Sequence, residues 1–195
     1  MILRVLFAAA LLGGCSLLAP PQPEPEKAAL TKLPDKIPHG ARRAATVVVL
    51  PTEAGAAYDT TRMAYSERPY QLAYFRDHEW AEPPSGMIQK LLVRVLEQTG
   101  AFRSIFTAPE AATSGYVLRS EILDLVQDDT RAPPVLRFAL RLELRKTSGQ
   151  AAASRDIRIE EPMRAATPAA GVFAANDALA KALQQAATIV LENAR

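Results

Sequence analysis

The chain has 195 residues, 49% of them hydrophobic, and a formal charge of only +2 at neutral pH. This length suits one domain with a tether and can bury a substantial core. The near-neutral charge, with no basic run beyond Arg42-Arg43, argues against a nucleic-acid-binding protein. A single cysteine excludes an internal disulfide, so stability must come from the core alone.

The N-terminus has the pattern of a secretory signal. Arg4 precedes a short apolar run, and Gly13-Gly14 lead directly to Cys15. The run is shorter than the roughly 20 apolar residues that a spanning helix needs. Residues 12–15, Leu-Gly-Gly-Cys, resemble a bacterial lipobox. The alternative is a plain signal peptide with an incidental cysteine.

On the lipobox interpretation, residues 1–14 are a lipoprotein signal peptide and the Cys15 thiol is the lipid attachment site. The thiol carries a diacylglycerol, with palmitate as the expected acyl chain. Two or more chains anchor a protein stably. Ser16 stands where an acidic residue commonly signals inner-membrane retention. We therefore expect a lipid-anchored protein on the outer membrane that faces the periplasm.

The next segment, residues 15–43, is expected to be the lipidated cysteine and a linker. It contains six prolines, which break helices and central strands: Pro20, Pro21, Pro23, Pro25, Pro34 and Pro38. At about 3.1 Å per residue its extended reach is on the order of 60–80 Å. The folded domain is then expected over residues 44–195.

Three strands and a helix are predicted in the first half of the domain. Residues 45–50 have the composition of a buried strand. Residues 60–66 and 70–76 are predicted to form a hairpin whose turn contains Pro69. A helix over 85–99 follows from an apolar stripe, with Ser85 as N-cap and Gly100 as C-terminal stop. The stripe consists of Met87, Ile88, Leu91, Leu92, Val95 and Leu96.

The second half is dominated by strands. A short strand over 103–107 and a loop precede predicted strands over 116–127, 134–146 and 152–162. The clearest alternation lies in 134–146, with one apolar face and one face of arginine and glutamate, which indicates an antiparallel sheet with one wet side. The apolar face is Leu136, Phe138, Leu140, Leu142 and Leu144.

A second helix is predicted at the C-terminus. Thr167 can cap it and Pro168 suits its first turn, although Gly171 also allows a start nearer Asn176. Its stripe is Leu179, Leu183, Ala186 and Val190, with Phe173 and Ile189 nearby. The predicted fold class is therefore α/β (α+β): a mixed, largely antiparallel sheet with two main helices packed on one face.

Catalytic chemistry is expected to be absent. The chain has two histidines and neither a phosphate-binding loop nor a nucleophile elbow. Asp77-His78-Glu79 could serve a hydrolase only if folding brought a nucleophile near His78. Asp128-Asp129 is expected in a solvated turn. We therefore predict no enzyme, no catalytic residue, no metal and no cofactor.

Residues 66–84 are rich in aromatic and ionisable side chains. Trp80 and Pro83-Pro84 are expected to form the corner that starts the first helix. The aromatic residues left uncovered, together with Arg76, are expected to face a partner, because aromatics and arginine dominate interface energetics. The candidate partner-binding residues are Tyr65, Tyr70, Tyr74, Arg76 and Trp80.

The region from 44 to 192 resembles the ABC-type transport auxiliary lipoproteins, a family that includes the paraquat-inducible protein C lipoproteins. The resemblance rests on Arg62, Tyr65, Tyr70, Trp80-Ala81-Glu82-Pro83-Pro84, Gly100-Ala101-Phe102 and the strands of 116–125 and 136–146. The family often has an early Tyr-x-Leu strand, for which "ALTKLP" at 29–34 is the nearest substitute here.

The resemblance implies a non-enzymatic envelope component. Its expected partners are a substrate-binding protein with mammalian-cell-entry (MCE) domains and the permease and ATPase of the same system, which would move lipid between membranes. A homo-oligomer is compatible with this role, and no nucleic acid is expected. The alternative is a lipoprotein that regulates an envelope enzyme such as a peptidoglycan synthase.

Overall fold

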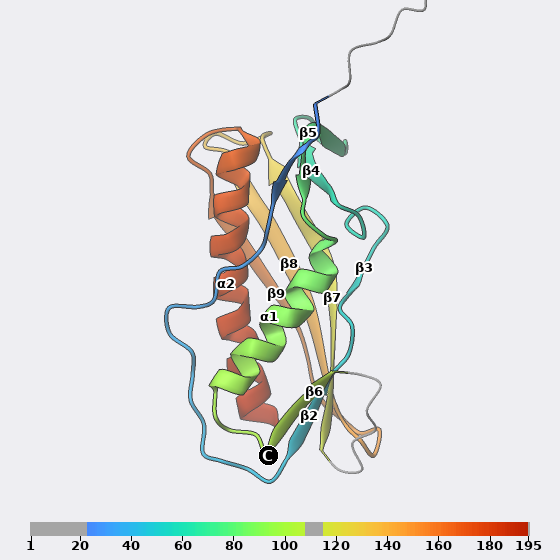
Figure 1. Cartoon of the computed structure of the whole chain (residues 1–195), viewed down its shortest axis with the longest axis vertical. Coiled ribbons are helices and arrows are strands. Elements are labelled where there is room, and N and C mark those ends of the chain that lie inside the picture. The colour runs from blue at the N-terminus through green and yellow to red at the C-terminus, as the bar shows by residue number, and fades with distance from the viewer. Residues whose placement is uncertain (1–22, 108–114, 195) are drawn as a thin grey trace, which may run out of the picture.

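The computed structural model describes residues 23–107 and 115–194. The predicted signal peptide, residues 1–14, and Cys15 lie outside the described residues. Two helices cover one face of a mixed sheet (Figure 1). The strands are β1 (Glu26–Ala28), β2 (Thr46–Val49), β3 (Glu53–Ala54), β4 (Arg62–Ser66), β5 (Ala73–Trp80), β6 (Ser104–Thr107), β7 (Tyr116–Asp128), β8 (Val135–Lys146) and β9 (Ala151–Pro162). The helices are α1 (Pro84–Gln98) and α2 (Pro168–Asn193).

The sheet is organised around β7. One edge of β7 pairs with β8 from Tyr116 to Asp128, and β8 pairs in turn with β9; both ladders are antiparallel. The other edge of β7 pairs in parallel with β2, then β3, then β4, at successive positions along the strand. Two branches extend from that edge: β2 continues to β6, and β4 continues through β5 to β1. The predicted fold class is confirmed, since the long ladders are antiparallel and the short pairings mixed.

The predicted apolar faces form the core. The five alternating side chains of β8 are each at most 2% exposed, and each such burial contributes roughly 1.5–3 kcal/mol. The stripes of both helices close over them, and all belong to one hydrophobic cluster. The side chain of Phe173 lies outside it and is exposed.

The helix ends differ in part from the prediction. α2 begins at Pro168, and the Thr167 hydroxyl accepts a hydrogen bond from the Ala170 amide, as predicted. Gly171 lies inside α2 because it packs on Gln127, whose side chain would overlap any Cβ there. Ser85 is not the cap of α1, since the helix begins one residue earlier after Pro83. Gly100 follows α1 with a φ of 66°, as a helix stop requires.

The described part of the proline-rich segment is a strap on the domain rather than a linker ahead of it. β1 pairs in parallel with the end of β5, and Leu30 is only 3% exposed. The Asn176 side chain accepts hydrogen bonds from the Thr31 and Lys32 amides and donates one to the Ala29 carbonyl. The prolines keep the segment extended, as expected, but side chains of α2 hold it in place.

Candidate functional site

The aromatic stretch forms a twisted hairpin, although its turn differs from the predicted one. β4 and β5 are antiparallel, with Ala64 opposite Tyr74 and a register irregularity nearby. The second strand begins at Ala73 and not at residue 70. Tyr70 therefore lies in the turn, with a φ of 65° and a fully exposed side chain. The prediction of a strand over 70–76 is therefore wrong for its first three residues.

Tyr65 and Phe75 stack on one side of the hairpin. Their ring centroids are 4.4 Å apart, and both side chains are half-buried. Phe75 also packs against the hydrophobic core and meets the His78 ring at 6.3 Å. Tyr65 is therefore mainly a packing residue of the hairpin, with part of its surface left open.

Tyr74 is fixed by two contacts. The Arg62 guanidinium lies 3.9 Å from the centre of its ring, a cation–π contact worth about 0.5–1 kcal/mol at an exposed site. Its hydroxyl donates to the Ala57 carbonyl at 3.1 Å. Arg76, two residues further along β5, is exposed. Arg62, Tyr74 and Arg76 thus place cationic and aromatic groups on a short stretch of hairpin.

Trp80 is the structural joint that the sequence predicted. It ends β5, is 4% exposed and belongs to the hydrophobic core. Its amide donates to Thr61, and α1 begins four residues later. A side chain buried in this way offers no surface to a partner, so Trp80 drops out of the predicted partner-binding set.

The His78 ring lies between two carboxylates. His78 Nδ1 lies 3.0 Å from Asp77, and Nε2 lies 3.5 Å from Glu26 on β1. The hydrogen bond from His78 lowers the pKa of the Asp77 carboxyl. Both imidazole nitrogens face carboxylates, so neither is directed at a hydroxyl nucleophile. Within residues 23–107 and 115–194, no group of acidic, histidine and cysteine side chains has a geometry that could hold a metal.

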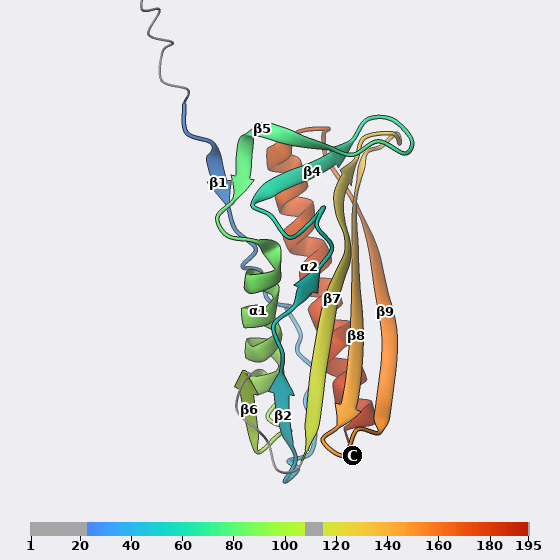
Figure 2. The same cartoon turned by 90° about the vertical axis from the view of Figure 1, so that its right-hand side faces the viewer.

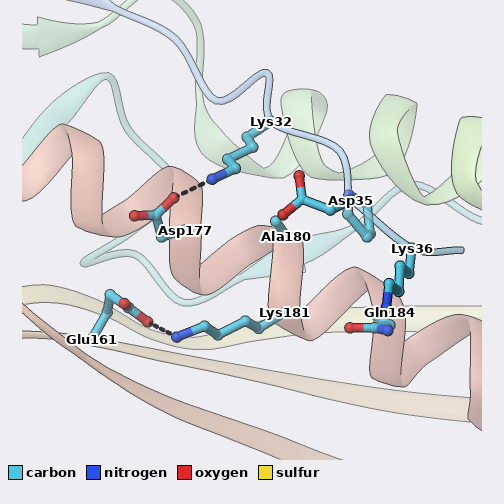
Figure 3. Close-up of a pocket in the computed structure, with 9 residues that line it drawn as sticks. Lys32, Asp35, Lys36, Glu161, Asp177, Ala180, Lys181 and Gln184 are labelled. Atoms are coloured by element: carbon cyan, nitrogen blue, oxygen red, sulfur yellow. Dashed lines mark hydrogen bonds and ion pairs between the residues drawn. The ribbon is translucent and has the colours of Figure 1, made fainter.

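A polar hollow of about 510 Å³ lies between the strap and α2. Lys32 contacts Asp177 across it at 2.6 Å, and Lys181 contacts Glu161 at 2.6 Å (Figure 3). The bond to Asp177 raises the pKa of Lys32. Seven of its nine lining residues have charged or polar side chains. The full lining is Lys32, Pro34, Asp35, Lys36, Glu161, Asp177, Ala180, Lys181 and Gln184.

Sequence reasoning missed this hollow. Its two walls come from residues 32–36 and from residues 161–184, and no local pattern indicates that they meet. The only sequence signal is Asn176, a polar residue in an apolar helix, whose amide holds the strap.

The outer face of the sheet carries charge pairs between neighbouring strands. Arg141 lies 2.8 Å from Asp156 on β9 and 3.7 Å from Glu121 on β7. Arg119 lies 2.8 Å from Glu53 on β3. Exposed pairs of this kind contribute well under about 1 kcal/mol each. This face is therefore a solvated surface with balanced charge.

The Asp128-Asp129 turn is not solvated as predicted. The Asp128 side chain is only 6% exposed and lies 3.6 Å from Arg131 and 3.7 Å from Arg137. Burial works to raise the pKa of Asp128, but bonds from Thr130 and the two arginines outweigh it and lower the pKa. Burial, followed by the charges of Glu67 and Asp128, raises the pKa of the neighbouring Asp129.

Among the described residues, neither helix combines the length and the apolar character that crossing a membrane requires.

Comparison with known families gives a match over residues 29–187, to the model of the ABC-type transport auxiliary lipoprotein component. The chain belongs to this family. The predicted resemblance is thereby confirmed, and the match begins within the strap, ahead of residue 44. Family membership describes a membrane-anchored envelope component of an ABC-type transport system.

Solved structures share the fold at low sequence identity. Protein XCC0632 from Xanthomonas campestris, of the DUF330 family, superposes with a TM-score of 0.77 at 20% identity, covering 86% of this chain and 95% of that one. The hypothetical protein CT253 from Chlamydia trachomatis gives a TM-score of 0.54 at 9% identity, covering 78% and 98%. A search of curated proteins finds no match.

Proposed function

We propose that this protein is a non-enzymatic lipoprotein, anchored in the outer membrane through Cys15, that docks the periplasmic MCE protein of an ABC-type lipid transport system. The observation that carries the proposal is the family match over residues 29–187. A component of this kind draws energy from the ATPase of its system and contributes binding surface instead of chemistry.

The β4–β5 hairpin is the proposed docking surface for the MCE protein. It combines the held ring of Tyr74, the guanidinium of Arg62 and the exposed Arg76. A ring already fixed by two contacts loses little side-chain entropy on binding, which favours affinity. Tyr65 contributes the open edge of its stack with Phe75.

The test is affinity capture from solubilised membranes with a tagged copy of the full chain. We expect the MCE protein and the permease or ATPase of the same system to be recovered. Recovery of peptidoglycan synthases alone would contradict the proposal and favour the envelope-enzyme regulator.

A matched pair of variants tests the surface. Arg76→Glu reverses an exposed charge on the hairpin, and Arg103→Glu reverses an exposed charge beside β6 at the opposite end of the domain. We expect Arg76→Glu to reduce recovery of the MCE protein at least several-fold and Arg103→Glu to leave it unchanged. Equal recovery with both variants would remove the hairpin from the interface.

A further inference from the structure

Exposed apolar side chains gather at one end of the domain. Tyr70 is fully exposed, Phe173 is 76% exposed and Leu72 is 41% exposed. We call these three residues the apolar tip. Phe106, 37% exposed, is the remaining large hydrophobic side chain left open among the described residues, and it lies on β6 at the opposite end (Figure 2).

The sheet register places the apolar tip at the end where β7 finishes. Ser66, just before the turn that carries Tyr70 and Leu72, is opposite Asp128 at the end of β7. α2 starts at the same end, since Gly171 packs on Gln127. Both views show the β4–β5 turn and the start of α2 together at this end (Figures 1 and 2).

The fold leaves Tyr70 and Phe173 largely uncovered. Tyr70 has a positive φ, which is uncommon for any residue but glycine. Its side chain is fully exposed, so the ring does not pack on the described part of the chain. Phe173 is exposed on α2, although most of the other apolar residues of that helix are buried.

The chain also enters the domain at this end. β1 runs parallel to the end of β5, across this end of the domain from the β4–β5 turn (Figure 2). Only seven residues, 16–22, lie between Cys15 and Pro23, where the described structure begins. The eight Cα–Cα steps from Cys15 to Pro23 span at most about 30 Å. The 60–80 Å expected of a free linker is therefore not available.

This short tether restricts which end can meet a bilayer. α2 has 26 residues and is about 39 Å long, so the opposite end of the domain lies further from Pro23 than the tether can span. With Cys15 held in the membrane, the apolar tip faces the lipid and the β2–β6 end faces away.

The charges around the apolar tip also suit a lipid surface. Arg68 lies in the β4–β5 turn and Arg164 in the segment before α2, and both are exposed. Neither guanidinium has an ion pair with any described residue, whereas Glu67 is the acidic neighbour in the turn. Basic side chains beside aromatic rings are typical of protein surfaces that rest on anionic headgroups.

We propose that the apolar tip inserts into the lipid surface that holds the Cys15 anchor and fixes the domain upright on it. This inference rests on the lipidation of Cys15 in the proposed function. Weak insertion is sufficient, because a short tether keeps the tip at an effective concentration on the order of millimolar. Upright docking would leave the β2–β6 end free.

The test uses tryptophan fluorescence in the full lipidated chain. Trp80 is the single tryptophan and is buried, so it provides a constant background. Tyr70→Trp, Phe173→Trp and the control Phe106→Trp each add one exposed reporter. The variants are reconstituted in phosphatidylethanolamine–phosphatidylglycerol vesicles with and without brominated acyl chains. We expect the added emission to fall by roughly half or more at positions 70 and 173, as for groups buried about 5–10 Å in the interface, and to stay constant at 106.

The outcomes separate this inference from the proposed function. A chain that floats with vesicles but shows no quenching at 70 and 173, or equal quenching at 106, overturns the apolar tip alone. A chain that does not float contradicts the Cys15 anchor and this inference with it. An emission change at positions 70 and 173 that needs a protein partner and is the same with and without brominated chains assigns the tip to that partner and overturns the inference. If Tyr70→Trp fails to fold, Leu72→Trp reports on the same turn.

Discussion

The two edges of β7 are built in different ways. On one edge β8 follows β7 in sequence and pairs with it, and β9 follows β8 and pairs with β8 in turn, residue against residue for most of their length. On the other edge β2, β3 and β4 arrive from early in the chain, and each covers only a few residues of β7. The first edge is made of local contacts and the second of distant ones.

This difference explains why the second edge of β7 needs additional stabilising contacts from elsewhere in the chain. Distant pairings must first overcome loop-closure entropy, and a two- to five-residue strand offers few hydrogen bonds in return. The strap supplies the missing contacts: Leu30 enters the core, Asn176 bonds to residues 29–32, and the Arg43 guanidinium donates to the Leu191 carbonyl at 2.8 Å. The proline-rich segment thus stabilises the half of the sheet that is weakest locally.

The largest expected effect is from Leu30→Ala. Leu30 is 3% exposed and its amide contacts the Met87 sulfur at 3.2 Å. Removing a buried leucine costs about 2–5 kcal/mol through lost burial and the cavity left behind. We expect the free energy of unfolding in urea to fall by this amount.

Lys27→Ala is the control, because Lys27 is exposed on the same strap. Its effect should stay within about 0.5 kcal/mol. Equal stability of Leu30→Ala and the parent chain would mean that the strap is a tether after all, and the contrast between the two edges of β7 would lose its explanation.

The local edge was predictable from the sequence and the distant edge was not. The period-two alternation of 136–144 identifies β8, its buried face and its antiparallel neighbours. No local pattern shows that β4 lies beside the end of β7 or that β1 pairs with β5, because such pairings depend on the whole packed chain. The prolines of the strap led to the prediction of a linker for the same reason. They indicate an extended backbone, and both a linker and an edge strand have one.

The candidate site follows the same division. Trp80 as the joint before α1 could be predicted from the local order of strand, Pro83-Pro84 and helix. Its burial could not, because it depends on the core that packs around it. Alternation also failed for Tyr70, which lies in the turn with a positive φ ahead of β5, whose first residue is Ala73.

A second prediction concerns the charge group on the local edge. The Asp128 carboxylate, 6% exposed, joins the end of β7 to Arg137 on β8 and to Arg131. We expect Asp128→Asn to lower the free energy of unfolding by roughly 1.5–3 kcal/mol at pH 7, as for buried hydrogen bonds to a charged group.

The pH dependence follows from the lowered pKa of Asp128. A carboxyl with a lower pKa in the folded state stabilises the fold above its unfolded pKa, near 3.9, and that contribution is lost as pH falls through the folded pKa. The difference between the parent chain and Asp128→Asn, measured by urea unfolding, should therefore shrink below about pH 4. If the difference in free energy of unfolding stayed constant down to pH 2, the stability lost in Asp128→Asn would come from altered packing and not from the missing charge.

The smallest effect, and the one with the opposite sign, is expected from Asp129→Asn, where the local edge meets the hairpin. One carboxylate oxygen of Asp129 is buried without a hydrogen bond from any described residue, and Glu67 lies close enough to repel it. Its raised pKa means that the charged form of Asp129 destabilises the fold above the folded pKa, and this destabilisation disappears as pH falls toward 3.9.

We expect Asp129→Asn to raise the free energy of unfolding at pH 7 by up to about 1 kcal/mol. Because the charge of Asp128 is one cause of the raised pKa, the gain should be smaller in the Asp128→Asn background. A loss of stability in Asp129→Asn would mean that Asp129 fastens the hairpin to β7 through its charge, which would make the distant edge stronger than its contacts indicate.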